Sequence, residues 1–476
     1  MAQAPPAEVP AKKTRRANKL ISELRQEIEA ELKHFPEWPE EARKALQSGK
    51  IRLRAGTGRL QVQTRALIAK AKLSAPKLPS LRLPKFSVPK RADTPKVQLS
   101  AKRPPRPSGK TLPIGLDIGT TAIKWAQFAQ RDGKARLVRL GLEPITIAPT
   151  VPEALRLGEM KEQLKRVVSS QGLSGPVALS LPVDEARFRL VKMPVLPPDE
   201  MKDALRWQVE QSLPAGTTFQ DVIADYIALP GLGAAAPEPR VLIVTVSRAK
   251  VAGIMDCVRG TGLNPVAVEV DPAAIQSCLS AQGRTSPQET TLLLHLGAAN
   301  ASFSIFVGGY LAFSRPILTM GNSLTQTISE QLRVAPAEAE TLKRTFGLLR
   351  APGVPASTPP AEDPTGRAAA VSQSLASPME NLMVDLLTAF KGFSHQMTQS
   401  QIQRFDRVFL DGGGAALPGL LPWLQLRMGA PVEIINPLAG FELDPAVSQE
   451  RSWAEAASHL SVAVGLAARD LADSKP

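Results

Sequence analysis

Two stretches of the chain share one pattern of hydrophobic and polar positions. In the first, the apolar run Leu112–Leu116 leads into Asp117 and the small-residue turn Gly119–Thr121, after which apolar residues resume. In the second, Thr290–Leu296 leads in the same way into Gly297 and a further apolar run. Apolar runs of this length on either side of a small-residue turn are typical of β-hairpins. The pattern therefore predicts two related hairpins.

A third stretch continues into a helix after its turn. The apolar strand pattern of Arg407–Asp411 ends in Gly412–Gly414, and a helical pattern comes next. Hydrophobic periodicity predicts further elements between these stretches. Helices are expected over 152–171, 198–212, 249–262, 322–333, 335–346, 379–403 and 452–470, and strands over 176–181, 187–192, 241–247 and 265–270. Alternation of helices and strands predicts an α/β protein, with an inserted α/β subdomain at about 146–270.

The first 111 residues have a different character. Apolar residues at three- and four-residue spacing predict an amphipathic helix over 18–35, and a second basic segment over 51–73 is a candidate for a marginal helix. We therefore assign 1–72 to a basic, partly helical extension and 73–111 to a linker rich in Pro, Lys and Arg. The globular part covers 112–476. Within it, the Ala-, Ser- and Pro-rich segment at about 350–378 predicts a disordered loop.

Composition and charge sharpen this division. The chain has 476 residues, 43% of them hydrophobic, which is enough for more than one domain. Residues 1–110 hold 26 lysines and arginines against 9 acidic residues, a balance of +17, whereas the rest carries −3. Two cysteines without metal spacing and the lack of a long apolar run indicate a reducing, cytoplasmic setting. The extension is either a solvated tail or a contact for an anionic membrane surface or an acidic partner.

The first hairpin carries candidate nucleotide chemistry. Backbone N–H groups and hydroxyls at the tip of a tight turn can surround a phosphate. Asp117 is suited to hold hydrated Mg²⁺, and Lys124 to place a cation at the phosphates. Glycines such as Gly412–Gly414 allow the backbone to approach a nucleotide closely. An ordinary hairpin is the alternative for each segment taken alone.

In order and spacing, the two hairpins and the glycine turn resemble the phosphate and adenosine motifs of the actin-like ATPases. The segments 180–182, 191–194, 204–214 and 339–347 make the chain most similar to the PilM family of type IV pilus assembly. The resemblance covers about 112–472. It implies an actin-like ATPase fold with two lobes and a partner-binding subdomain inserted in the first lobe.

The resemblance also implies the ligands, ATP and Mg²⁺, and their residues. In related pockets Glu and Lys reach the ribose hydroxyls and Arg packs on the adenine, which assigns Glu340, Lys343 and Arg344 to those roles. His295 departs from the pattern, because it stands where an aspartate usually begins the second phosphate loop. Imidazole is a poor Mg²⁺ ligand, so slow or absent hydrolysis is expected. The residues assigned to nucleotide binding are Asp117, Gly119, Thr120, Thr121, Lys124, Gly297, Glu340, Lys343, Arg344, Gly412, Gly413 and Gly414.

The function implied is an ATP-binding cytoplasmic scaffold under the inner membrane. Its expected partners are the N-terminal cytoplasmic peptide of a PilN-like membrane protein, the platform and motor proteins of pilus biogenesis and twitching motility, and further copies of itself. Residues flanking 180–182 and 207–214 are expected to line the peptide groove. An FtsA-like filament or membrane-recruitment protein of cell division is the alternative, and a sugar kinase using Asp271 is a third; helix capping is the other interpretation of Asp271. A related secretion or DNA-uptake machine also fits this sequence.

Overall fold

The computed structural model describes residues 54–56, 59–61, 110–131, 134–147, 151, 153–193, 196–229, 240–319, 321–354, 363, 366–397, 404–448 and 453–472. Most of the basic extension and linker, including the helix expected over 18–35, lies outside these residues. Strands β1 (Arg54–Gly56) and β2 (Arg59–Gln61) form an antiparallel pair in a unit of their own. The marginal helix expected over 51–73 is therefore wrong for these residues, where Gly56 lowers helix propensity.

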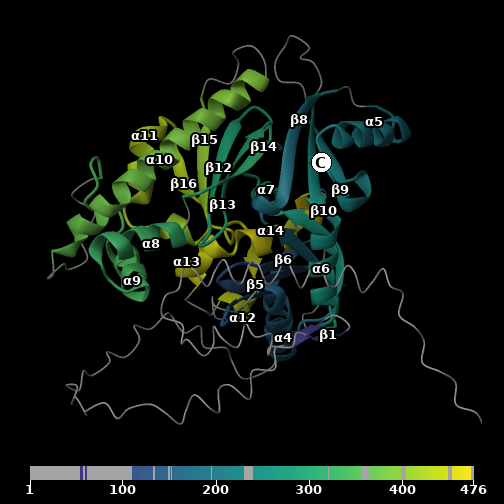
Figure 1. The fold of residues 1–476 in the computed structure, drawn as a ribbon, viewed down its shortest axis with the longest axis horizontal. Coiled ribbons are helices and arrows are strands. Elements are labelled where there is room, and N and C mark those ends of the chain that lie inside the picture. The colour runs from purple at the N-terminus through teal and green to yellow at the C-terminus, as the bar shows by residue number, and fades with distance from the viewer. Residues whose placement is uncertain are drawn as a thin grey trace, which may run out of the picture. The chain divides into compact units, whose positions relative to one another are not determined.

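A seven-stranded sheet forms the base of the globular unit (Figure 1). Its path runs β11-β7-β4-β5-β6-β17, and β3 pairs with β5. β4 pairs in antiparallel fashion with β5, as the first hairpin predicts, and in parallel with β7. The strands are β3 (Lys110–Thr111), β4 (Ile114–Ile118), β5 (Ala122–Arg131), β6 (Lys134–Pro144), β7 (Pro176–Leu181), β11 (Asn264–Val270) and β17 (Glu442–Leu443).

A five-stranded sheet forms the second lobe, in the order β14-β13-β12-β15-β16. The second predicted hairpin is its β12–β13 pair, and β15 lies parallel to β12. The strands are β12 (Thr290–Leu296), β13 (Ala301–Val307), β14 (Tyr310–Ile317), β15 (Arg407–Asp411) and β16 (Val432–Ile434). Its helices are α8 (Gly321–Leu332), α9 (Pro336–Phe346), α10 (Arg367–Gln396) and α11 (Leu420–Met428).

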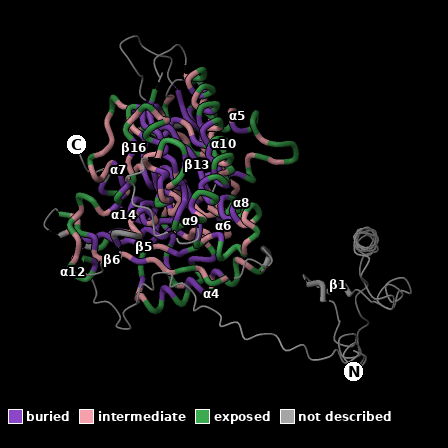
Figure 2. The backbone as a smooth tube through the Cα atoms, turned by 90° about the vertical axis from the view of Figure 1, so that its left-hand side faces the viewer, coloured by how far each residue is buried: buried purple, intermediate pink, exposed green. Residues whose placement is uncertain are grey.

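Helices α7 (Asp271–Ala281) and α14 (Ser461–Ala472) lie between the two large sheets (Figure 1). A side chain at Gly465 would place its Cβ 1.8 Å from the carbonyl oxygen of Ala274, so glycine permits this close helix contact. Gly115 on β4 likewise leaves room for the backbone of α14. Figure 2 shows buried residues concentrated in the strands and exposed ones on the outer helices. Both lobes therefore share one central helical layer.

A separate three-stranded sheet, in the order β8-β10-β9, forms the inserted subdomain. It contains β8 (Ala186–Lys192), α5 (Pro198–Glu210), β9 (Val222–Leu229) and β10 (Arg240–Ser247). The insertion expected at about 146–270 is thus too wide. Strands β7 and β11 pair within the seven-stranded sheet, and α4 (Glu153–Gln171) and α6 (Arg248–Arg259) pack beside it. Sequence alternation does not reveal which sheet a strand joins.

Helix α10 corrects the loop expected at about 350–378. It begins at Arg367 and runs through Pro378, because Val371 and Leu375 bury fully against the second lobe. The Asp363 carboxylate accepts hydrogen bonds from the backbone N–H groups of Arg367 and Ala368. These bonds satisfy two of the free backbone donors in the first turn of the helix. Residues 355–362 and 364–365 lie outside the described part. Burial therefore outweighs the local cost of proline here.

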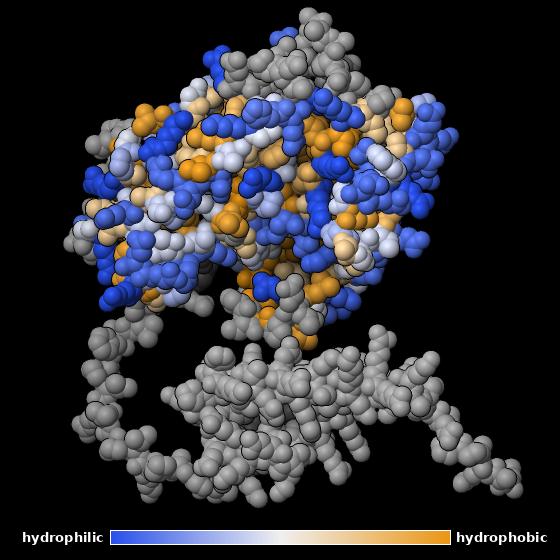
Figure 3. Space-filling view, turned by 45° about the horizontal axis from the view of Figure 1, so that its top comes forward, coloured by the Kyte–Doolittle hydropathy of each residue, from blue (hydrophilic) through white to orange (hydrophobic). Residues whose placement is uncertain are grey.

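The C-terminal segment is divided where one helix is expected over 452–470. The structure has α13 (Trp453–Ala456), a 3₁₀ turn (Ala457–His459) and then α14, preceded by the short α12 (Pro445–Ser448). Among the described helices, none has the length and apolar character needed to cross a bilayer. On the face shown in Figure 3, hydrophobic residues form separated groups among hydrophilic ones. Scattered exposed apolar residues are normal and do not by themselves mark an interface.

Candidate functional site

The first hairpin places a carboxylate and an ammonium group opposite each other. Asp117 on β4 and Lys124 on β5 are cross-strand partners, and Lys124 Nζ lies 2.6 Å from Asp117 Oδ2. Both side chains are nearly buried, at 10% and 12% exposure. The Gly119 N–H donates to the Ala122 carbonyl across the turn that contains Thr120 and Thr121. Lys124 therefore lies at this turn, paired with Asp117, and its contact with a phosphate stays a prediction.

The second hairpin turn is tied to helix α8. The Gly297 N–H donates to the Asn300 carbonyl at 3.0 Å, and a Cβ on Gly297 would lie 2.2 Å from that oxygen. The Gly297 carbonyl accepts the Gly321 N–H, and the Ala298 carbonyl accepts the Asn322 N–H. The turn thus requires glycine and satisfies donors at the start of α8.

The triple-glycine turn after β15 packs against the protein itself. Gly412 has a φ of +82°, and a Cβ there would lie 2.7 Å from the Leu296 carbonyl oxygen. A Cβ on Gly414 would meet Leu296, and one on Gly413 would lie 2.6 Å from the ring of His459. Close approach of β12 and His459 therefore explains all three glycines. A direct role for them in nucleotide binding stays a prediction.

His295 is paired with a buried aspartate. His295 and Asp411 are partners in the parallel β12–β15 register, and His295 Nδ1 lies 2.7 Å from Asp411 Oδ2. Burial lowers the pKa of His295, but the hydrogen bond and charge of Asp411, with the charges of Asp271 and Asp117, outweigh it and raise the pKa. Asp411 therefore favours protonation of His295 relative to a free imidazole. Asp411 is 1% exposed, and its Oδ1 has no hydrogen-bond partner among the described residues.

Asp271 completes the charged group between the lobes. It is the first residue of α7, and Ser180 on β7 hydrogen-bonds its carboxyl group. Burial raises the pKa of Asp271 to about 7; Asp117 adds to this shift, whereas His295, Ser180 and Lys124 oppose it. The helix-capping interpretation is wrong, since the N-cap is Val270 and no side chain caps there. Ser180 is buried next to this carboxyl, and the peptide groove expected along the residues that flank 180–182 stays a prediction.

His459 links this group to helix α9. Its ring lies against Gly413, and burial lowers the pKa of His459, with Lys124 adding to the decrease. Asp411 opposes the shift, and the charge of Arg344 also reaches the ring. The imidazole is therefore neutral at neutral pH. Sequence reasoning missed both Asp411 and His459; the one signal for Asp411 was a carboxylate at the end of an apolar strand, directly before a glycine turn.

The three residues assigned to the adenosine end form an internal network. Lys343 Nζ donates to the Gly321 carbonyl, to Thr325 Oγ1 and to Glu340 Oε2, all within 2.8 Å. Those three bonds use every donor of the ammonium group. Arg344 Nε donates to Glu340 Oε1, and the Arg344 side chain is 66% exposed. The network holds α9 to the start of α8, so ribose contacts by Lys343 would require exchange of existing bonds.

The network shifts both partners' pKa values. Burial alone would raise the pKa of Glu340, but hydrogen bonds from Lys343, Thr325 and Arg344 hold it at about 2. Burial lowers the pKa of Lys343, and Glu340 offsets part of that decrease. Glu340 is therefore a carboxylate at neutral pH, and Lys343 Nζ lies 2.7 Å from its Oε2. The geometry therefore describes a true ion pair.

The carboxylates of this charged group are engaged within the protein. Within the described residues, no three His, Cys, Asp or Glu side chains are grouped so that they could hold a metal. Asp117 is engaged by Lys124, and Asp411 by His295. Mg²⁺ requires near-octahedral oxygen ligation, which these engaged carboxylates do not offer together. Phosphate contacts by Lys124 and a water-mediated Mg²⁺ at Asp117 both stay predictions.

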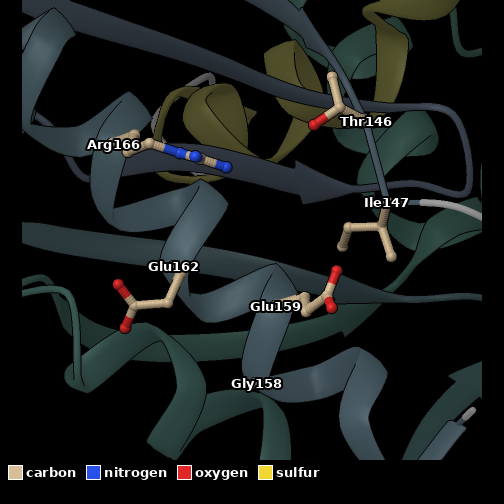
Figure 4. A pocket seen from close by; sticks show the side chains of 6 residues that line it. All are labelled: Thr146, Ile147, Gly158, Glu159, Glu162 and Arg166. Carbon is tan, nitrogen blue, oxygen red and sulfur yellow. The ribbon is translucent and has the colours of Figure 1, made fainter. Parts of the chain in front are cut away.

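A separate surface pocket of about 300 Å³ lies between α4 and the end of β6. Figure 4 shows Glu159, Glu162 and Arg166 on α4 beside Thr146 and Ile147. None of the residues assigned to nucleotide binding lines this pocket. It is therefore distinct from the charged group between the lobes.

Comparisons with known proteins identify the family and the fold of this chain. The family model described as type IV pilus assembly protein PilM matches residues 115–351 and 371–471. A solved PilM–PilN type IV pilus biogenesis complex is similar, with 23% sequence identity, a TM-score of 0.62 and coverage of 76% of this chain and 99% of that chain.

Weaker similarities are to the ethanolamine utilization protein EutJ from Carboxydothermus hydrogenoformans (14% identity, TM-score 0.43, 78% of this chain and 93% of that chain) and to MreB 5 of Spiroplasma citri bound to AMPPNP (12% identity, TM-score 0.41, 75% of this chain and 95% of that chain). Of these three structures, the PilM–PilN complex alone supports the fold assignment.

Proposed function

The chain belongs to the family of the type IV pilus assembly protein PilM, and from that premise we propose that it is an ATP-binding docking protein of the inner-membrane assembly platform. The observation that carries this proposal is the match of the family model across both lobes and the inserted subdomain. The protein would act at the cytoplasmic face of the membrane, where a membrane-spanning partner recruits it. Its role would be to connect that partner to the platform and motor proteins.

The proposed partner is the N-terminal cytoplasmic peptide of a PilN-like membrane protein. A similar solved structure is a PilM–PilN complex, which supports this choice. The inserted subdomain offers a surface for it at the end of α5, where Trp207 is 59% exposed. Exposed tryptophans contribute strongly to binding energy when a partner covers them. Beneath that surface Met201 and Val209 bury into the small sheet, so α5 is firmly held.

Slow hydrolysis is the second part of the proposal. His295 stands where an aspartate usually begins the second phosphate loop, and its Nδ1 is occupied by Asp411 Oδ2 at 2.7 Å, so it offers no carboxylate to orient an attacking water. Asp271 is the remaining buried carboxyl near Lys124 and is bonded to Ser180. The site therefore favours retention of the nucleotide over rapid turnover.

Peptide binding is tested with the full-length protein and a labelled synthetic peptide from the cytoplasmic N-terminus of a PilN-like protein. Fluorescence anisotropy should show saturable binding, weakened at least about tenfold by Trp207→Ala, as expected for a central aromatic anchor. Leu426→Ala, on the exposed face of α11 in the other lobe, is the matched control and should leave the affinity unchanged. If both variants bind the peptide with equal affinity, α5 is not part of the interface.

Nucleotide binding and turnover are measured separately. Calorimetric titration with ATP should show binding that Lys124→Ala weakens, while phosphate release stays near background. Steady-state turnover comparable to that of ordinary ATPases, above roughly 1 s⁻¹, would contradict the proposed slow hydrolysis.

A further inference from the structure

Helix α10 carries two neighbouring apolar side chains on its exposed face. The opposite face of the helix buries Leu382, Leu386 and Phe393 in the core of the second lobe, along which α10 runs (Figure 1). On the exposed face, Val384 and Leu387 are 60% and 54% exposed. The helix is therefore held firmly from one side and presents an apolar pair to solvent on the other.

Residues of opposite charge flank this apolar pair. Glu380 lies four residues before Val384, and Lys391 lies four residues after Leu387; both charged residues are exposed. Spacings of four, three and four residues place the four side chains in one row along a helix, because one turn takes 3.6 residues. We name Glu380, Val384, Leu387 and Lys391 the contact row. It has an apolar centre, an acidic end and a basic end.

The contact row is complementary to itself when its direction is reversed. Glu380 and Lys391 stand equally far from the midpoint of the row, and so do Val384 and Leu387. A second copy of α10, antiparallel to the first about a two-fold axis through that midpoint, would place Val384 against Leu387 of the other copy. It would also place Glu380 against Lys391 of the other copy, and the symmetry makes each contact twice. A parallel copy in register would set like charges against each other, which is unfavourable.

We propose that the contact row is a self-association surface, through which two copies of this chain pair by antiparallel packing of α10. The inference goes beyond the proposed function, because it uses neither α5 nor any residue assigned to nucleotide binding. Rows with alternating spacings of three and four residues are the ones through which two helices pack at a small crossing angle. In the antiparallel arrangement, the apolar centre becomes covered and each charged end meets its opposite.

The charged ends of the row are available for this contact. Lys391 has no ion-pair partner among the residues that the structure describes. Glu380 accepts a bond of 3.4 Å from Arg427 Nη2 of α11 through its Oε1 and is still 61% exposed. A carboxylate has a second oxygen that can accept another donor. Glu380 can therefore meet an ammonium group of a second copy while it keeps its contact with Arg427.

The length of the row sets the strength of the contact. The row occupies roughly 16 Å of a helix that is about 45 Å long. Such a contact belongs to the small, transient interfaces that bury less than about 1,200 Å² in total. We therefore expect a dissociation constant of roughly 10–100 μM for the dimer. The charged ends act mainly on orientation, because exposed ion pairs contribute little affinity and like-charge pairs disfavour the wrong arrangement.

The test measures self-association of the full-length protein by sedimentation equilibrium at physiological salt. The wild type should form dimers in the concentration range given above. Leu387→Asp introduces two buried charges into the apolar centre of the dimer and should weaken association by about tenfold or more. Leu155→Asp is the matched control, because Leu155 on α4 is 60% exposed and lies outside the contact row. It should associate as the wild type does.

Charge reversal tests the antiparallel register. Glu380→Lys alone and Lys391→Glu alone each create two like-charge pairs in the symmetric dimer, so each should weaken association by about fivefold or more. The double variant, Glu380→Lys with Lys391→Glu, should recover the wild-type affinity, because every contact is again between opposite charges. In a parallel pair, all four proteins would have like charges in contact, and the double variant would recover nothing.

The possible results separate clearly. A wild type that stays monomeric at about 200 μM would overturn the inference. Dimers that form equally well with Leu387→Asp would overturn it too, because association would then use another surface. Single charge variants that associate weakly, with no recovery in the double variant, would overturn the antiparallel register. None of these results bears on peptide or nucleotide binding, which the experiments on the proposed function test separately.

Discussion

Arg240 Nη1 donates a 2.6 Å hydrogen bond to the carbonyl oxygen of Gln396. Arg240 begins β10 of the inserted sheet and is 5% exposed, whereas Gln396 is the last residue of α10 in the second lobe. The guanidinium thus satisfies a carbonyl at a helix C-terminus, where a cation is favoured. Leu229 of the insertion also belongs to the core of the second lobe. The proposed partner-binding subdomain therefore packs against the second lobe as well as the first.

Removing that bond should destabilise the protein. Arg240→Met keeps the apolar stem and loses the charged donor, so we expect the free energy of unfolding to fall by about 1.5–3 kcal/mol. Urea denaturation measures it. Arg259→Met, which breaks the exposed Arg259–Asp256 pair, is the control and should change stability by at most about 0.5 kcal/mol. Equal effects would mean that the buried contact adds no stability.

The Glu340–Lys343 ion pair should stabilise the folded protein. Glu340→Gln leaves the buried ammonium of Lys343 without its counter-charge, and we expect a loss of about 1–3 kcal/mol, less than for a fully buried pair because Glu340 is partly exposed. The double variant Glu340→Gln with Lys343→Met should recover part of that loss. Glu330→Gln, at an exposed site on α8, is the control. Failure of the double variant to recover stability would argue that the charges are not coupled.

The same pair predicts acid sensitivity. The pKa of Glu340 is about 2 in the folded protein and starts from 4.5, so its stabilising contribution is present above pH 4.5 and is lost as pH falls toward 2. Glu340→Gln should therefore differ most from the wild type at neutral pH and least below pH 3. A difference that stays constant across this range would contradict the assignment.

Asp271 should make the protein less stable as pH rises. Its pKa is raised from 3.8 to about 7, so the folded state holds a proton that the unfolded state releases. The stability associated with the neutral carboxyl is complete below pH 3.8 and is lost as pH rises to about 7. Asp271→Asn cannot ionise, and its stability relative to the wild type should rise by about 2–3 kcal/mol between pH 5 and pH 8.

Unfolding midpoints of both proteins at the two pH values measure this difference. Asp225→Asn, on an exposed position of β9, is the control for loss of one carboxyl group. An Asp271→Asn variant that gains nothing at pH 8 would show that Asp271 is stabilised as a carboxylate.

Gly412 should be intolerant of any side chain. Gly412→Ala combines a φ of +82° with a Cβ 2.7 Å from the Leu296 carbonyl oxygen. Gly440 has a φ of +77° but no neighbour within 4 Å of its Cβ, so Gly440→Ala isolates the conformational cost of about 1–2 kcal/mol. We expect Gly412→Ala to exceed it by roughly 1–3 kcal/mol. Equal thermal shifts would show that the turn can move away from β12.

The amino-acid sequence was sufficient to predict most local elements, the actin-like fold and the family, and the comparisons confirm the fold and the family. Both hairpins and the strand before the glycine turn were predicted from apolar runs bounded by small residues, because turn chemistry and side-chain alternation act between near neighbours. Asp117 and Lys124 were expected together for the same reason, since a tight turn brings them opposite each other.

Other features depend on contacts between residues that are far apart in the sequence. Whether β7 and β11 join the large sheet or the insertion depends on pairing between distant strands, which local patterns do not encode. Helix α10 forms through Pro378 because burial against the second lobe offsets the local penalty. The group formed by Asp271, His295 and Asp411 comes from three separate elements. Its charges and pKa shifts arise from burial and proximity, and both exist only once the lobes have packed together.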